Sequence, residues 1–249
     1  LALALAQQLV GCTRPPRVLI LTCTGFAYGG APCDAAHGGV WGFARVLRVE
    51  QAVLHTQSAD AARGEGLVAS RMMLAPTAEA EAACVASLRV VARLRACSAL
   101  SAPETALVYG LYAVTGGLGG LGMRAATLLV EAGASGVLLA SRSGRVVRDG
   151  QGLEAQLQSM STVAAVVAGD SADACDASAL CCVDSLAGVL HAAGVLHDKM
   201  LRSMVSDDVG AVFASKGLAA SHVHAIVVRA PLEVFGLFSS VASTFGNVG

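Results

Sequence analysis

A glycine-dense turn near the middle of the chain limits what this sequence can fold into more than any other feature. Residues 112–122 read Tyr-Ala-Val-Thr-Gly-Gly-Leu-Gly-Gly-Leu-Gly, an apolar run that leads into a tight turn and then a helical pattern. Glycines let the backbone bend sharply and approach a ligand closely. The first turn of a helix adds unpaired N–H groups and the positive end of its dipole. The segment is typical of a loop that holds a dinucleotide pyrophosphate.

The loop matches two overlapping patterns, Thr-Gly-x-x-x-Gly-x-Gly and the dinucleotide fingerprint Gly-x-Gly-x-x-Gly. Either match alone would be weak, and a purely structural turn is the alternative. The position after a predicted strand and before a predicted helix is the context that the fingerprint requires. The residues predicted to bind the cofactor here are Thr115, Gly116, Gly117, Leu118, Gly119, Gly120, Leu121 and Gly122.

A second apolar run ends at Ser141-Arg142, twenty residues beyond Gly122. An acidic residue at this distance would bind a ribose 2′-hydroxyl, whereas an arginine favours a 2′-phosphate. The pair Ser141 and Arg142 therefore predicts NADPH as the cofactor.

Composition excludes several classes of protein. Of the 249 residues only 14% are charged and 55% are apolar, against about 25% charged in a typical domain. This low charge fits either a surface that a partner covers or a simple excess of alanine. No apolar run reaches the ~20 residues of a membrane helix, so we expect a cytoplasmic protein without membrane contact. A net charge of −1 without a basic block argues against a nucleic-acid partner.

The eight cysteines include no Cys-x-x-Cys pair, which favours reduced thiols and no metal site. The chain begins without an initiator Met or a basic leader. We therefore expect a piece of something longer rather than a signal peptide.

A Pro- and Ser-containing stretch at 98–105 predicts a boundary between two subdomains, 1–104 and 105–249. The first has no glycine-rich loop after its first strand, so we expect a truncated Rossmann-like layer without cofactor. Plain packing is favoured over catalysis there. Its predicted elements are a strand at 17–23, a helix at 38–54, a strand-like run at 71–74 and an Ala-rich helix at 77–97.

The second subdomain alternates strands and helices more clearly, which predicts an α/β fold with a Rossmann-like, doubly wound parallel sheet. A ligand should lie across the carboxyl ends of its strands. The predicted strands are 109–114, 136–141, 163–168, 186–190 and 233–239, and the predicted helices 120–132, 150–160, 172–181 and 204–222.

Two further strand ends offer candidates. Asp170 follows the third strand, where its carboxylate would accept a hydrogen bond from an adenine amino group or cap the next helix. The fourth strand closes with His191, Ala192, Ala193 and Gly194, small residues that let a nicotinamide ribose lie against the backbone. An isolated histidine in apolar context is more often a core residue than a base, so we assign His191 no chemistry.

Lys216 lies on an otherwise largely uncharged helical pattern, and Ser239-Ser240 ends the last predicted strand. A solvated lysine and a turn would explain each of them alone. Because both follow the glycine loop along the chain in this order, they become stronger candidates for site residues.

Several segments in their order along the chain carry a resemblance: 114–122, 138–144, 188–196, Lys216 and 238–242. Through them the chain closely resembles the ketoreductase domain of modular polyketide synthases, a branch of the short-chain dehydrogenase/reductase family. Residues 39–50 resemble the signature of the family's cofactor-free structural subdomain.

This resemblance implies a mechanism. NADPH delivers hydride to the β-keto carbon of an acyl chain, while a tyrosine donates a proton to the keto oxygen. The acyl chain is tethered to an acyl carrier protein, and the domain is part of a synthase of several domains. Such a tyrosine must lose its proton near neutral pH, so a nearby ammonium is needed to lower its pKa. Lys216 takes that role and holds the nicotinamide ribose, and Ser240 hydrogen-bonds the carbonyl oxygen. Asp170 is then assigned to adenine.

The catalytic tyrosine is expected thirteen residues beyond Ser240, at position 253, whereas the chain ends at Gly249 and its tyrosines lie far upstream. We expect truncation rather than loss, and no ketone reduction by this polypeptide alone. Two other readings stay open: a non-catalytic layer that packs against synthase domains, and a stand-alone short-chain dehydrogenase. The first hundred residues argue against the latter, because such enzymes normally begin close to the glycine loop.

Overall fold

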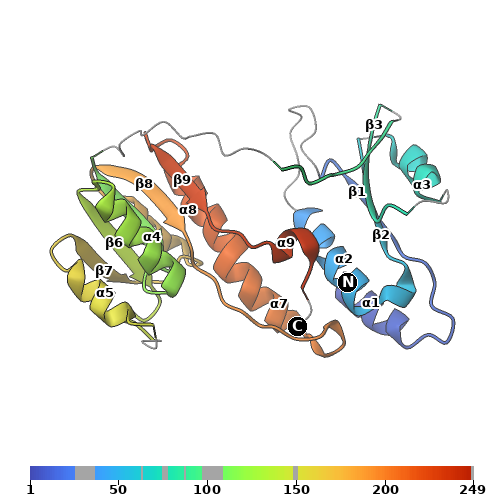
Figure 1. Cartoon of the computed structure of the whole chain (residues 1–249), viewed down its shortest axis with the longest axis horizontal. Helices are drawn as coiled ribbons and strands as arrows, with labels where there is room; N and C mark the ends of the chain where they lie inside the picture. Colours follow the sequence, from blue (N-terminus) through green and yellow to red (C-terminus); the bar gives the residue numbers. More distant parts are fainter. Residues whose placement is uncertain are drawn as a thin grey trace. The chain divides into compact units, whose positions relative to one another are not determined.

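The computed structural model describes residues 1–25, 37–62, 64–74, 78–86, 88–96, 109–147 and 151–247. The chain divides into two compact units. Unit 1 comprises residues 1–98, 198–204 and 239–249, and unit 2 comprises 99–197 and 205–238 (Figure 1). The boundary predicted at 104/105 lies outside the described residues and stays a prediction.

Unit 2 is built on a parallel sheet, and this confirms the predicted fold class. The order of its described strands is β7-β6-β5-β8-β9, with every neighbouring pair parallel. The strands are β5 (Leu111–Thr115), β6 (Gly136–Ser141), β7 (Ala164–Ala168), β8 (Leu186–His191) and β9 (Val234–Leu237). Because β5 lies between β6 and β8, the direction of winding reverses there, and a crevice is expected at the carboxyl ends of β5 and β8.

Helices cover both faces of this sheet (Figure 1). The faces separate because successive residues of β5 point in opposite directions. Tyr112 and Val114 pack with α4 (Gly120–Glu131) and α5 (Leu153–Ser159). Ala113 belongs to a second cluster with α6 (Ala174–Cys181) and α8 (Ala219–Val227). Between α7 (Ser206–Phe213) and α8, residues Ala214–Leu218 form a π-helical turn.

Unit 1 contains a sheet of order β1-β2-β3-β4, in which β3 and β4 are antiparallel and the other pairs parallel. Its strands are β1 (Leu19–Cys23), β2 (Gln57–Ala61), β3 (Glu81–Val85) and β4 (Leu88–Val90). Its helices are α1 (Ala2–Val10), α2 (Gly38–Glu50), α3 (Gly66–Leu74) and α9 (Ala242–Phe245), with short 3₁₀ turns at Ala52–Leu54 and Leu201–Ser203.

Two expectations for this unit are wrong, and one strand was missed. The strand-like run at 71–74 is the end of α3, and the Ala-rich helix at 77–97 is replaced by β3 and β4. Buried and half-buried residues alternate along β3, so pairing with β2 outweighs the helix propensity of alanine. Strand β2 was not predicted, because its sequence Gln-Ser-Ala-Asp-Ala has no branched or aromatic residue.

No helix among the described residues has both the length and the apolar character needed to cross a bilayer.

Candidate functional site

A cavity of about 330 Å³ lies at the carboxyl edge of the unit 2 sheet. It is lined by residues from the ends of the four neighbouring strands β5, β6, β7 and β8, and from the helical segment 211–215. Among the residues predicted from the sequence, those that line it are Thr115, Gly116, Ser141, Arg142, Asp170, Ala193 and Gly194.

The glycine loop packs so tightly that several of its positions exclude any side chain. Gly116 has φ +66°, and a β-carbon there would lie 2.7 Å from the backbone of Ala193. A β-carbon on Gly117 would lie 2.8 Å from the Cα of Leu139, and one on Gly122 would run into the carbonyl of Gly116. The glycines thus let β5, β6 and the segment after β8 approach one another beneath the loop.

The helix that follows the loop begins without a side-chain cap. Gly119 is the N-cap of α4 and provides no side-chain cap. The N–H groups of this turn have no partner within the helix, so they offer donors to an anion. The side chain of Leu118 is buried in the core, and Leu121 is 55% exposed. Any cofactor contact by Leu118 would therefore come from its backbone.

Ser141 and Arg142 bring a hydroxyl and a cation to the cavity. The Oγ of Ser141 is buried and has no hydrogen-bond partner in the described part of the chain. Among the described residues, no carboxylate forms an ion pair with Arg142. An unpaired guanidinium beside an unsatisfied hydroxyl fits a phosphate group, because both are donors that a phosphate oxygen accepts from.

Asp170 does not cap the helix that follows it, which corrects one of its two predicted roles. The cap of α6 is Asp173, whose carboxylate accepts from the N–H groups of Cys175 and Asp176. Asp170 Oδ1 accepts from the N–H of Ala172 at 3.0 Å, a local turn at the rim of the cavity. The adenine role stays a prediction.

His191 is 4% exposed and hydrogen-bonded at both ring nitrogens, as expected of a core histidine. Its Nδ1 lies 2.7 Å from Thr115 Oγ1, and its Nε2 lies 3.2 Å from the carbonyl oxygen of Lys216. Burial lowers the pKa of His191, an effect partly offset by its hydrogen bonds to the backbone of Lys216 and Ser215. The imidazole is therefore neutral at pH 7.

Lys216 stands in the π-helical turn, and its aliphatic stem runs along the backbone of Gly194. Ser240, the other predicted catalytic residue, belongs to unit 1. There its Oγ accepts from the N–H of Ala242 at 3.2 Å, at the start of α9. Within unit 2 the structure thus brings Lys216 to the strand end that carries His191–Gly194.

Sequence reasoning missed several residues that line the cavity. Ala211, Ala214 and Ser215 are small residues spaced three and four apart, and such spacing places residues on one helix face. That stripe, just before Lys216, was a usable signal. His197, whose Nδ1 lies 3.3 Å from Asp208 Oδ1, was not among the predicted site residues. Ala140, Gly169, Ser171, Ala172 and Val195 complete the lining.

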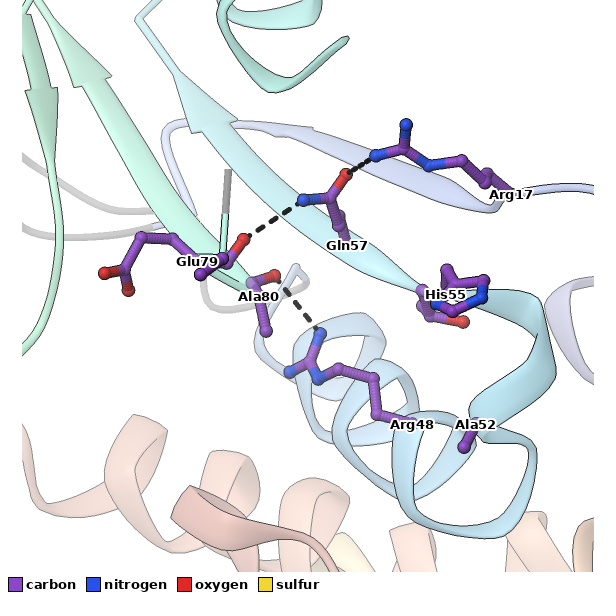
Figure 2. Close-up of a pocket in the computed structure, with 9 residues that line it drawn as sticks. Arg17, Arg48, Ala52, His55, Gln57, Glu79 and Ala80 are labelled. Atoms are coloured by element: carbon purple, nitrogen blue, oxygen red, sulfur yellow. Dashed lines mark hydrogen bonds between the residues drawn. The ribbon is translucent and has the colours of Figure 1, made fainter. Parts of the chain in front are cut away.

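Unit 1 contains a larger cavity, of about 510 Å³, at the amino ends of β1, β2 and β3 (Figure 2). Three of its polar side chains, those of Arg17, Arg48 and Gln57, bond to their neighbours. Gln57 accepts from Arg17 at 2.9 Å and donates to the carbonyl of Glu79 at 3.1 Å. Arg48 forms an ion pair with Glu81 and donates to the carbonyl of Ala80. These contacts join neighbouring strands and α2, so we assign the cavity a structural role.

Described residues at the carboxyl edge of the unit 1 sheet form a hydrogen-bonded cluster. The indole N–H of Trp41 donates to Thr22 Oγ1 at 2.9 Å, and Thr22 donates to Asp60 at 2.6 Å. Asp60 also accepts from the N–H of Gly25. Trp41, Thr22 and Asp60 are all buried, and their polar groups hydrogen-bond to one another.

Comparison with known proteins places the chain among reductase domains. The model of the KR domain family matches residues 110–249. Polyketide synthase GfsA of Streptomyces halstedii is 40% identical over 145 residues, which cover 56% of this chain and 2% of that protein. The 6-methylsalicylic acid synthase of Arthrobotrys oligospora is 33% identical over 180 residues, which cover 66% of this chain and 10% of that protein.

Solved structures agree. An A-type ketoreductase from a modular polyketide synthase superposes with a TM-score of 0.85 at 30% identity, covering all of this chain and 55% of that one. The first ketoreductase of the tylosin synthase gives a TM-score of 0.84 at 29% identity, covering all of this chain and 56% of that one. The chain thus spans about half of these structures and a tenth or less of the curated relatives.

Proposed function

Because the chain belongs to the KR domain family, the ketoreductase domains of modular polyketide synthases, we propose that unit 2 binds NADPH for the reduction of a β-ketoacyl group. The observation that carries this proposal is the cavity at the carboxyl edge of the sheet. There Thr115 and Gly116, at the start of the glycine loop, line one space together with Arg142 and the segment Ala193–Gly194. This edge is where parallel α/β sheets bind nucleotides.

The cavity and the helix that begins beside it suit different parts of the cofactor. The uncapped first turn of α4 would donate to the pyrophosphate. Arg142 and the unsatisfied Oγ of Ser141 would bind the 2′-phosphate. The free oxygen of Asp170 would accept from the adenine amino group, and Ala193–Gly194 would lie along the nicotinamide ribose.

When bound, NADPH would supply a hydride to the carbonyl carbon of the substrate. The ammonium of Lys216 would hold the nicotinamide ribose and favour ionisation of the proton-donating tyrosine. Ser240 would donate a hydrogen bond to the carbonyl oxygen as negative charge develops on it. None of the three tyrosines of the sequence, Tyr28, Tyr109 and Tyr112, stands where the family pattern has this proton donor.

The printed polypeptide should accordingly bind NADPH without reducing ketones. Tyr112 cannot replace the missing donor, because its hydroxyl is committed to Glu233 at 2.7 Å. Burial and the adjacent carboxylate raise the pKa of Tyr112 to about 12, so it resists ionisation near neutral pH.

The proposed substrate is a β-ketoacyl chain tethered to an acyl carrier protein, with other synthase domains as partners. Support comes from the curated relatives, which are polyketide synthases many times longer than this chain. A membrane or nucleic-acid partner forms no part of the proposal.

Titration of the polypeptide with NADPH and with NADH, followed by nicotinamide fluorescence, tests the cofactor assignment. We expect one saturable site that prefers NADPH at least tenfold. Equal affinities would contradict the role of Arg142, and no saturation would contradict the proposal as a whole. Extending the chain to include the expected tyrosine should restore reduction of a β-ketoacyl thioester. If the parent protein has another residue there and no activity, a non-catalytic packing role is favoured.

A further inference from the structure

A chain of hydrogen bonds links the glycine-loop strand to the turn that carries Lys216. Thr115 and His191 are paired at the carboxyl ends of β5 and β8, where the direction of winding reverses. Thr115 Oγ1 accepts from the N–H of Ala193 at 3.4 Å and lies 2.7 Å from His191 Nδ1. His191 Nε2 lies 3.2 Å from the carbonyl oxygen of Lys216. All the residues that these hydrogen bonds connect belong to unit 2.

The chemistry of the partners fixes the direction of these bonds. A backbone carbonyl only accepts, so the Nε2 of His191 must carry its proton toward Lys216. A neutral imidazole then has a lone pair on Nδ1, and the hydroxyl of Thr115 donates to it. The burial of His191 favours this uncharged form.

The Lys216 carbonyl lies in a π-helical turn, a wider turn than the α-helices on either side of it. Besides the bond from His191, the hydroxyl of Ser215 accepts from the N–H of Val195 at 3.2 Å. Two contacts thus tie this turn to the last residue of β8 and to the segment that follows the strand. With the turn fixed, the stem of Lys216 lies along Gly194, one of the residues that line the cavity.

We propose that His191 is a positioning residue, which fixes the π-helical turn through the Lys216 carbonyl and thereby places the Lys216 ammonium at the cavity. The action of the ammonium on the nicotinamide ribose rests on the proposed function. The role of His191 in holding the turn is independent of the proposed function. Sequence reasoning assigned His191 no chemistry. In this proposal His191 acts on the cofactor only indirectly, through Lys216.

Two substitutions of His191 distinguish the contribution of its Nε2 donor from that of its Nδ1 position. Gln at position 191 has an amide nitrogen near the place of Nε2, so His191→Gln keeps a donor for the Lys216 carbonyl. His191→Asn reaches only as far as Nδ1 and loses that donor. We expect faster amide exchange over residues 216–219 in His191→Asn and nearly normal exchange in His191→Gln. His224→Asn is the matched control, because His224 is exposed on α8 and should change neither.

A double-mutant cycle with Lys216→Met tests whether His191 acts through the lysine. His191→Asn should weaken NADPH binding about fivefold, as for the loss of one ordinary hydrogen bond. In the Lys216→Met background it should have no further effect. Equal losses in both backgrounds, or unchanged exchange at 216–219, would overturn the inference.

The two proposals fail in different ways. If Lys216→Met leaves NADPH affinity unchanged, the assigned role of Lys216 falls, while amide exchange still decides whether His191 holds the turn. Nitrogen-15 shifts of the imidazole give a readout independent of stability. We expect the neutral Nε2–H tautomer in the wild-type chain, and the Nδ1–H tautomer would contradict the inference.

Discussion

The backbone of Gly194 lies against the side chain of Lys216: a β-carbon at position 194 would come within 2.9 Å of Lys216 Cε and 3.6 Å of its Cγ. Because the nearest atom is the far end of a flexible side chain, Gly194→Ala should displace the ammonium rather than the backbone. We expect a change of under about 1 kcal/mol in the free energy of unfolding, together with roughly fivefold weaker NADPH binding.

Gly210→Ala on α7 is the matched control, because a β-carbon there meets no atom within 4 Å. It should leave NADPH affinity unchanged and stabilise the helix by about 0.5–1 kcal/mol. A Gly194→Ala chain that binds NADPH normally would show that the placement of Lys216 is unimportant for binding.

Gly116 should tolerate no side chain, since it combines a positive φ with close backbone contact to Ala193. We expect Gly116→Ala to lower the free energy of unfolding by at least about 2 kcal/mol, from left-handed strain and overpacking together. Urea denaturation of Gly133→Ala measures the effect of backbone strain without overpacking, because Gly133 has φ +102° and open space around it. Equal losses in the two variants would argue against tight packing of the glycine loop.

Arg142→Ala should weaken NADPH binding about tenfold or more, as expected for losing a charge-assisted hydrogen bond to a phosphate. Binding of NADH should hardly change, because NADH has no 2′-phosphate. Arg124→Ala removes the same charge from an exposed position on α4 and serves as the control. Parallel losses for both cofactors would assign Arg142 a merely structural role.

Tyr112→Phe tests the hydroxyl bonded to Glu233. Below pH 9 we expect the variant to be less stable by about 1 kcal/mol. The pKa of Tyr112 is raised to about 12 in the folded chain, against about 10 when unfolded. Stability from this shift is fully present below pH 10 and is lost as the pH rises toward 12. Urea denaturation across this range should show the wild-type advantage shrinking, and a constant difference would contradict the assigned pKa.

The sequence predicted unit 2 far better than unit 1, for a physical reason. Strands such as β6 and β8 are apolar runs separated by amphipathic helices, so local pattern and global fold agree. In unit 1, β2 and β3 consist of small and polar residues that become strands only through their neighbours. Tertiary pairing of that kind leaves no local signal.

Part of the site was likewise beyond sequence reasoning. The glycine loop and Arg142 could be identified as site candidates from the sequence, because their chemistry and spacing are local. The π-helical turn at Lys216 and the bond from His191 depend on residues 25 positions apart meeting in space. Asp173 shares the carboxylate character of Asp170, and only the geometry shows which of them caps α6.

Hydrogen–deuterium exchange with and without NADPH tests most directly where the cofactor binds. We predict slower exchange on NADPH addition over residues 115–122, 141–142, 169–172 and 192–195, the strand ends around the unit 2 cavity. Residues 55–61 and 78–86, beside the unit 1 cavity, should exchange as before. Protection confined to unit 1, or no protection at the glycine loop, would contradict the assignment of unit 2 as the NADPH-binding part of the chain.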